Sequence, residues 1–202
     1  MKNFEIKNQN GRSMIEMLGV LAIIGVLSVG GIAGYSKAMT KYRINKTIEQ
    51  ITLIAGNVRT FFGPQRNYSG LDAYDENKGG YYVIKKAKLI PDEMWDGNDI
   101  KHVWGGEFYL SSLSKSTGDD YQAFKIELRF LIPEEACIEI VSQDWSASGV
   151  KGIGIMNGSE NWTYLKAPAE MNDAITACTD ADFIEFYFDI DLSSSLWSST
   201  FN

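Results

Sequence analysis

The chain offers few side chains that could carry out catalysis. It contains a single histidine, His102, so a histidine-rich metal site is excluded and any histidine-based catalytic centre would depend on that residue. We interpret His102 as an ordinary loop or surface residue. Glu134 and Glu135 are adjacent, so on a helix they would point apart, which disfavours paired-carboxylate catalysis. The sequence therefore predicts that the protein is not an enzyme.

The sequence also lacks a convincing site for a metal or a phosphate group. Asp92, Asp96 and Asp99 surround Gly97-Asn98, but their spacing does not match the EF-hand pattern, and we interpret them as a polar turn. The glycines near residue 150 do not form the GxGxxG phosphate-binding pattern. The formal net charge of -7 disfavours non-specific binding of nucleic acid. We expect no cofactor, no metal and no specific nucleic-acid partner.

The two cysteines, Cys137 and Cys178, are the remaining reactive pair. An even pair fits a disulfide in an oxidising compartment, although two separate buried thiols are the alternative. An apolar N-terminal segment implies export and favours the disulfide. In the chain-entropy model, a bridge closing a loop of about 42 residues contributes roughly 4 kcal/mol.

The apolar segment itself runs without a charge from Met17 to Ser36, after a short polar stretch, Met1 to Gly11. About 20 such residues in a helix cover roughly 30 Å, the thickness of the hydrocarbon core of a bilayer. A secretory signal peptide would have a shorter apolar region and a small-residue cleavage site, and none stands out here. We therefore expect a retained membrane anchor rather than a removed signal.

One carboxylate stands at the edge of this apolar segment. Glu16 lies between Ile15 and Met17. A carboxylate in hydrocarbon costs a few kcal/mol unless it finds a partner. Glu16 either remains hydrated at the level of the lipid headgroups or is paired, and this feature alone favours neither interpretation.

The segment GRSMIEMLGVLAIIGV, Gly11 to Val26, resembles the N-terminal signature of type IV prepilins. In that family a peptidase cuts after a glycine on the cytoplasmic face, and the fifth residue of the mature chain is a glutamate. A cut between Gly11 and Arg12 makes Glu16 the fifth residue. The resemblance implies that the Glu16 carboxylate neutralises the α-amino group of Arg12 on a neighbouring subunit, because a buried charge is tolerable when it is paired.

The chain departs from the family pattern in two places. Arg12 stands where the family usually has an apolar residue, and the proline often found in the apolar run is absent. Instead the run contains Gly30, Gly31 and Gly34, and each glycine weakens a helix by ~1 kcal/mol relative to alanine. We expect this patch to stretch or melt when a filament forms. Close small-xxx-small helix packing is the alternative, and both can hold at once.

The helical pattern continues beyond the apolar run and predicts one helix from about Ser13 to Phe62. Its second half carries one apolar stripe, formed by Ile44, Ile48, Ile51, Ala55, Val58 and Phe62, with polar residues mostly on the other faces. Gly63-Pro64 ends the helix. The stripe is short for an independent coiled coil, so we expect it to pack on a head domain.

The rest of the chain predicts an α+β head with an antiparallel sheet. Alternation predicts strands and turn residues separate them, with prolines opening the two later helices. The expected elements are a short helix at 82–89, a strand near Phe108, a strand at 124–132, a helix from Pro133, a strand at 150–156, a pairing tract at 162–165, a helix from Pro168 and a strand at 183–190. The tail from Leu192 could be an edge strand, a packed tail or a disordered end.

Several head segments resemble type IVb pilins in particular. They are NVRTFF with NYSGL, the stretch LIPDEMWDGNDIKHVWGGEFYL from Leu89 to Leu110, and the two cysteine segments IPEEAC and AITAC. The resemblance implies the type IV pilin fold: a long N-terminal helix packed on an antiparallel sheet. The implied organisation is a leader at 1–11, a membrane and filament-core half-helix at 12–36, an amphipathic half-helix at 37–62, and a head at 63–202 with a disulfide-bounded region at 137–178.

The resemblance also implies a function. The chain would be a structural subunit of a type IVb-like pilus, serving adhesion, aggregation, motility or DNA transfer. Its partners would be copies of itself in a helical filament, the prepilin peptidase, the inner-membrane assembly machinery and the inner membrane. Basic residues flank the apolar run on both sides and do not decide its orientation, but the resemblance places the leader in the cytoplasm and the head in the periplasm before export to an extracellular pilus.

Two alternatives remain open from the sequence. The first is a minor pilin or a type II secretion pseudopilin. The second is a membrane-anchored exported binding domain.

Overall fold

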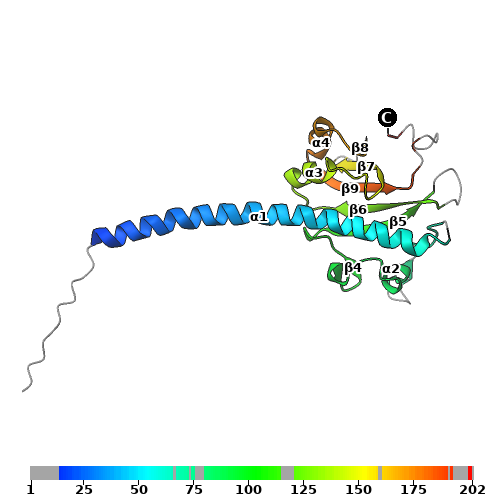
Figure 1. The fold of residues 1–202 in the computed structure, drawn as a ribbon, viewed down its shortest axis with the longest axis horizontal. Coiled ribbons are helices and arrows are strands. Elements are labelled where there is room, and N and C mark those ends of the chain that lie inside the picture. Colours follow the sequence, from blue (N-terminus) through cyan, green and yellow to red (C-terminus); the bar gives the residue numbers. More distant parts are fainter. Residues whose placement is uncertain are drawn as a thin grey trace, which may run out of the picture. The chain divides into compact units, whose positions relative to one another are not determined.

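The computed structural model describes residues 14–65, 67–72, 74–75, 80–114, 121–158, 161–190, 192 and 200–201. The chain divides into two compact units, Met1–Lys41 and Tyr42–Asn202. Helix α1, Met14–Phe62, contributes residues to both units (Figure 1).

The first unit is the apolar part of α1. Every described residue from Met14 to Ala38 is exposed. By length and composition α1 can cross a membrane, and the apolar window that qualifies is wholly exposed. Backbone hydrogen bonds within the helix satisfy its polar groups, so the segment needs no protein partner to be stable in lipid.

The second unit begins with the amphipathic half of α1. The predicted apolar stripe is confirmed, because Ile44, Ile51, Val58 and Phe62 are among its buried residues and Ile48 packs against the same core. The helix ends at Phe62, where the N–H of Gly63 donates to the carbonyl of Arg59 at 2.8 Å. The sequence therefore located both the packed face and the end of this helix.

A five-stranded antiparallel sheet forms the body of the head, in the order β5-β6-β9-β7-β8. The strands are β5 (Glu107–Leu113), β6 (Ala123–Arg129), β7 (Val150–Asn157), β8 (Asn161–Lys166) and β9 (Ala181–Phe188). Its inner face pairs large apolar side chains across strands, such as Phe124 with Phe188 and Ile126 with Phe186. These residues form one core cluster with the buried stripe of α1.

Smaller elements complete the α+β head that the sequence predicted. The segment after α1 contains the hairpin β1 (Tyr74–Asp75) and β2 (Gly80–Tyr81), α2 (Tyr82–Lys86), the 3-10 turn η2 (Asp92–Met94) and the hairpin β3 (Trp95–Asp96) and β4 (Asp99–Ile100). Helices α3 (Glu134–Val141) and α4 (Met171–Cys178) lie close to each other, and each contacts the sheet (Figure 1). Asp96 and Asp99 pair across the turn at Gly97-Asn98, which is the polar turn expected there.

Two strand boundaries differ from the prediction. Strand β6 ends at Arg129 rather than Ile132, and Phe130 and Leu131 have φ of 61° and 63°. Phe130 is therefore 44% exposed instead of lying in the core. Strand β9 ends at Phe188 rather than Ile190, because Asp189 has a φ of 59°. Left-handed backbone breaks the alternation on which the prediction relied.

The second inserted helix also differs from the prediction. It begins at Met171, three residues after Pro168. Its buried face consists of Ala174, Ala177 and Cys178, whereas the larger apolar residue Ile175 is 45% exposed. Small alanines face the core here because α4 packs closely against α3 and β7.

The position of His102 is the largest departure from what the sequence predicted. It lies in the loop between β4 and β5, but the expectation of a surface residue is wrong, because the side chain is 3% exposed. Its Nε2 contacts the carbonyl oxygen of Arg129 at 3.0 Å, and its Nδ1 accepts from the N–H of Trp104 at 3.3 Å. His102 thus joins this loop to the end of β6.

Phe201, near the C-terminus, packs onto the outer face of the sheet. Phe201 is buried and lies against Tyr164 and Tyr187, with ring centroids 5.4 Å and 5.3 Å away. Among an edge strand, a packed tail and a disordered end, the position of Phe201 therefore supports a packed tail.

Candidate assembly site

The candidate assembly site begins with Glu16, in the first turn of α1. Glu16 is exposed and is the sole acidic residue between Met14 and Ile48. The apolar residues around it are exposed as well, among them Met14 at 87% and Ile15 at 78%. The predicted cleavage position between Gly11 and Arg12 lies outside the described residues. A lone carboxylate therefore sits on an apolar surface that this chain does not cover within its described part.

The glycine patch does not interrupt α1. The helix is continuous through Gly30, Gly31 and Gly34. A Cβ atom added to any of the three would meet no described atom within 4 Å. Packing among the described residues of the chain therefore does not account for the glycines, and both earlier hypotheses, melting and close packing between subunits, concern contacts with other molecules.

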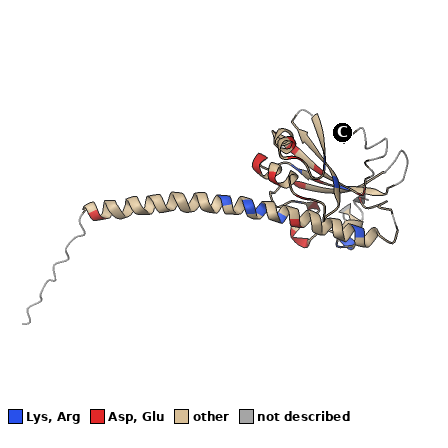
Figure 2. Cartoon of the chain, turned by 45° about the horizontal axis from the view of Figure 1, so that its top comes forward, with Lys and Arg blue, Asp and Glu red and all other residues tan. Residues whose placement is uncertain are grey.

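Basic residues follow the apolar half of α1. Lys37 and Lys41 are exposed, and Arg43 lies over the ring of Trp104, 5.5 Å from its centroid. Figure 2 shows the contrast along the helix, with an acidic residue at its beginning and a group of basic residues farther along. This order of charge suits a helix that enters an apolar phase with Glu16 and leaves it at the lysines.

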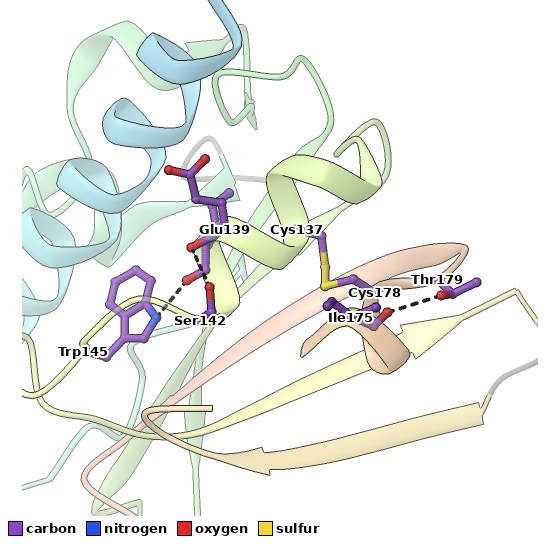
Figure 3. Close-up of a disulfide and its surroundings, with 8 residues drawn as sticks. Cys137, Glu139, Ser142, Trp145, Ile175, Cys178 and Thr179 are labelled. Carbon is purple, nitrogen blue, oxygen red and sulfur yellow. Dashed lines mark hydrogen bonds between the residues drawn. A yellow bond between two sulfur atoms is a disulfide. The ribbon is translucent and has the colours of Figure 1, made fainter. Parts of the chain in front are cut away.

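The predicted disulfide is confirmed. Cys137 in α3 and Cys178 in α4 are bonded, with 41 residues of sequence separation, and both are fully buried. Figure 3 shows the bridge between the two helices, with Trp145 nearby donating its indole N–H to the carbonyl of Ile140 at 3.0 Å. The bridge therefore fixes α3 and α4 to each other.

Comparison with known proteins identifies the family. A family model described as "PilS N terminal" matches residues 41–187, most of the chain. The chain belongs to this family of type IV pilins. The match covers the amphipathic half of α1 and the head as far as β9.

Individual relatives of this pilin are more distant. It is 24% identical over 179 residues to the "major structural subunit of bundle-forming pilus" of Escherichia coli O127:H6 (strain E2348/69 / EPEC), covering 87% of this chain and 86% of that protein. The protein of the same name from Escherichia coli O111:H- is 25% identical with the same coverage. The crystal structure of the type IVb pilin from Salmonella typhi has a TM-score of 0.48 and 17% identity, covering 73% of this chain and 99% of that one.

Membership of the family confirms the predicted class of function. This pilin is a structural pilus subunit and not an enzyme. Pilus subunits polymerise into filaments, and an apolar N-terminal helix fits membrane anchoring before assembly into an extracellular pilus.

Arg59 is a structurally important residue of the pilin, although it is one of the polar residues of α1 outside the predicted apolar stripe. Its guanidinium donates to both carboxylate oxygens of Asp189, at 2.9 and 3.3 Å, and to the carbonyl of Ser148 at 2.6 Å. Tyr68 donates to the same carboxylate at 2.6 Å, and burial raises the pKa of Tyr68 above its ordinary value. Arg59 therefore ties α1 to two loops of the head.

The outer face of the sheet contains a buried ionic network. Glu127 and Glu185 oppose each other across β6 and β9, and Lys125 bonds to both. Burial raises the pKa of Glu185, whereas the hydrogen bond from Arg129 and the charge of Lys125 lower the pKa of Glu127 against the effect of burial. Each buried carboxylate has a cationic partner, so we interpret the network as a means of fixing strand register rather than as a catalytic pair.

Proposed function

We propose that this pilin is a major structural subunit of a type IVb-like pilus, cleaved after Gly11 and polymerised through α1. The observation that carries the proposal is the fully exposed apolar half of α1 with a lone carboxylate, Glu16, in its first turn. A surface of this kind is stable in lipid or against copies of itself, but not in water. The two curated relatives, both major subunits of a bundle-forming pilus, support the same role for this chain.

Before assembly, the pilin resides in the inner membrane with its head in the periplasm. The uncharged run from Met17 to Ser36 occupies the lipid, and the head beyond Tyr42 stays in water. A prepilin peptidase removes the leader on the cytoplasmic side and frees the α-amino group of Arg12. The assembly machinery then lifts the helix out of the lipid and into the filament.

Glu16 selects the correct position of each incoming subunit. Its carboxylate pairs with the α-amino group of Arg12 on a neighbour, and a mispositioned subunit leaves that carboxylate unpaired in an apolar environment. An unpaired charge in such surroundings costs a few kcal/mol. The pairing therefore sets the axial register of the helices.

The variant Glu16→Val tests the pairing. We expect normal amounts of membrane-bound pilin and a pilus yield, in sheared surface fractions, at least about tenfold lower, because removing the carboxylate leaves the buried α-amino group of Arg12 uncompensated, which costs about 3–5 kcal/mol. Glu49→Val is the matched control, since Glu49 is an exposed acid on the head half of the same helix and forms a long 3.7 Å pair with Lys46. Equal yields from Glu16→Val and the unaltered protein would exclude the pairing.

The mass of the mature protein tests the processing step. A chain that begins at Arg12 supports cleavage after Gly11, whereas an intact leader on protein from assembled pili contradicts it. Abundance in the same sheared filaments distinguishes the major subunit from a minor pilin or a pseudopilin, because a major subunit dominates the filament mass.

A further inference from the structure

Charge is divided unequally between the two units of the chain. Of 19 basic and 26 acidic residues, five basic and two acidic lie in Met1–Lys41, which leaves 14 and 24 in Tyr42–Asn202 and a formal net charge of -10 for the head unit. The N-terminal unit has a net charge of +3 on the same count. Heads of this charge repel one another at short range, so a polymer of this chain needs local contacts of opposite charge.

A groove on the head concentrates the negative charge. It has a volume of about 560 Å³ and lies between α3 and α4, and its lining residues are Glu134, Glu135, Ile138, Glu139, Ser142 and Met171. Glu135, Ile138 and Glu139 recur at helical spacing and form one face of α3, and Ser142 follows directly at its C-terminal end. Met171 is 56% exposed, so the groove combines an apolar surface with an acidic rim.

Two carboxylates of this rim, those of Glu134 and Glu135, are not neutralised by the described part of the head. Neither Glu134 nor Glu135 has an ion-pair partner among the described residues, although Lys125, Arg129 and Arg59 elsewhere on the head are all paired with carboxylates. The disulfide between Cys137 and Cys178 holds the two helices that form the groove, so its shape is fixed before any partner arrives. A preformed groove binds at a lower entropic cost.

The complementary surface lies on α1. Lys37 and Lys41 are one turn apart, and Gly34 and Ala38 share their side of the helix. All four residues are exposed. This turn of α1, Gly34–Lys41, thus presents two ammonium groups beside two small residues that allow close approach.

We propose that the groove between α3 and α4 receives the turn Gly34–Lys41 of α1 from a second copy of this pilin. This contact rests on the proposed function, because it occurs in the filament. The lysine stems cover Ile138 and Met171 while their ammonium groups meet the carboxylates on the rim. The two surfaces differ and lie on the same chain, so the contact is head-to-tail and repeats into an open helical polymer.

Charge exchange tests the contact. Reversal on one side, by Lys37→Glu with Lys41→Glu or by Glu135→Lys with Glu139→Lys, lowers the pilus yield about tenfold or more, because like charges then face each other at close range. Combining the two reversals in one chain restores the yield to within about threefold of the unaltered protein, since the attraction returns with opposite sign. Asp173→Lys is the control, because Asp173 is an exposed acid of α4 outside the groove lining.

Failure of rescue overturns the proposal. If the lysine reversal instead weakens retention of the unassembled pilin in the membrane, and the groove reversal does not compensate, the lysines bind anionic lipid. Thermal unfolding of the detergent-extracted variants checks that each head remains folded.

A cross-link separates this inference from the proposed function. Lys37→Cys combined with Met171→Cys gives a ladder of disulfide-linked oligomers in isolated pili after mild oxidation, whereas Lys37→Cys alone does not. Pili that assemble normally but yield no ladder overturn the groove contact and leave the filament function intact. Absence of this chain from pili of the unaltered strain overturns the filament function itself.

Discussion

At the scale of single residues, the head depends on polar side chains that contact the backbone of distant segments. Arg59 lies over the rings of Phe124 and Phe188, at 5.9 and 5.5 Å, while its guanidinium reaches Asp189 and Ser148. A Cβ at Gly149 would meet the Arg59 guanidinium at 2.6 Å, so the absence of a side chain at Gly149 makes room for it. Arginine suits this position because its planar fork can bind a carboxylate and a carbonyl at once.

We predict that Arg59→Lys destabilises the head by about 2 kcal/mol, because an ammonium group keeps the charge but loses most of the fork geometry. Urea unfolding of the detergent-solubilised pilin, followed by tryptophan fluorescence, measures the change. Arg43→Lys is the control, since Arg43 is exposed and its guanidinium lies over the ring of Trp104. Equal effects from both variants would contradict the assigned role.

His102 gives the head a dependence on mild acid. Burial lowers the pKa of His102 below its ordinary value of 6.5. Below pH 6.5 the unfolded chain therefore binds a proton that the folded chain does not. As the pH decreases from 6.5, the free energy of unfolding decreases until the pH reaches the pKa of His102 in the folded protein. The contribution of neutral His102 to the free energy of unfolding is fully present above pH 6.5.

We predict that His102→Gln removes this dependence between pH 7.5 and 5.5, where the unaltered protein loses up to about 1.4 kcal/mol per pH unit from a single group. The glutamine variant is less stable at pH 7.5, because it does not reproduce both bonds of the imidazole. Free energies of unfolding at three pH values in that interval provide the measurement. Parallel curves for the two proteins would show that His102 does not titrate as described.

At the scale of elements, the outer face of the sheet is built to receive the tail. Gly152 and Gly154 lie on β7 opposite Tyr187 and Glu185 of β9. A Cβ at Gly152 would meet the ring of Phe201 at 2.3 Å, so the absence of a side chain there creates the space that Phe201 fills. Phe201 thus packs with Tyr187, Ala123 and Ile190 in one buried cluster.

We predict that Gly152→Ala and Phe201→Ala each destabilise the head by about 1–3 kcal/mol, since one displaces the ring and the other leaves a cavity. The double variant costs clearly less than the sum, because both changes remove the same contact. A double-mutant cycle by urea unfolding measures the coupling. Simple additivity would indicate that the tail does not pack on Gly152 in solution.

At the scale of the whole molecule, the division at Tyr42 assigns half of one helix to the head. The described residues from Met14 to Ala38 are exposed, whereas buried residues begin at Ile44. The amphipathic half of α1 therefore belongs energetically to the globular unit, although it is continuous in the backbone with the membrane segment.

We predict that a fragment starting at Tyr42 folds as a soluble protein with its disulfide, while a fragment starting at Gly63 does not fold. Removing 42–62 exposes the partners of several fully buried apolar side chains, a loss of roughly 10 kcal/mol that equals the whole stability of a typical domain. Circular dichroism and size-exclusion chromatography of the two fragments provide the measurement. A folded fragment from Gly63 would refute the assignment.

The sequence by itself determined those features that local spacing controls. The uncharged run from Met17 to Ser36, the apolar stripe ending at Phe62 and the alternation in 124–128 each carry their own period, so helix, anchor and core strand were predictable. The position of Glu16 within the segment Gly11 to Val26, which resembles the prepilin signature, was enough to indicate the family. The pairing of Cys137 with Cys178 followed because they are the two cysteines of an exported chain.

The tertiary structure decided those features that depend on distant neighbours. His102 is buried because the end of β6 lies over its loop, and Phe130 is exposed because the backbone turns left-handed after Arg129. Gly152 lies against the ring of Phe201, 49 positions away in the chain. The groove between α3 and α4 likewise joins segments that no local pattern connects. Periodicity records which face of an element is covered, but not which distant residue covers it, and that choice belongs to the packed chain.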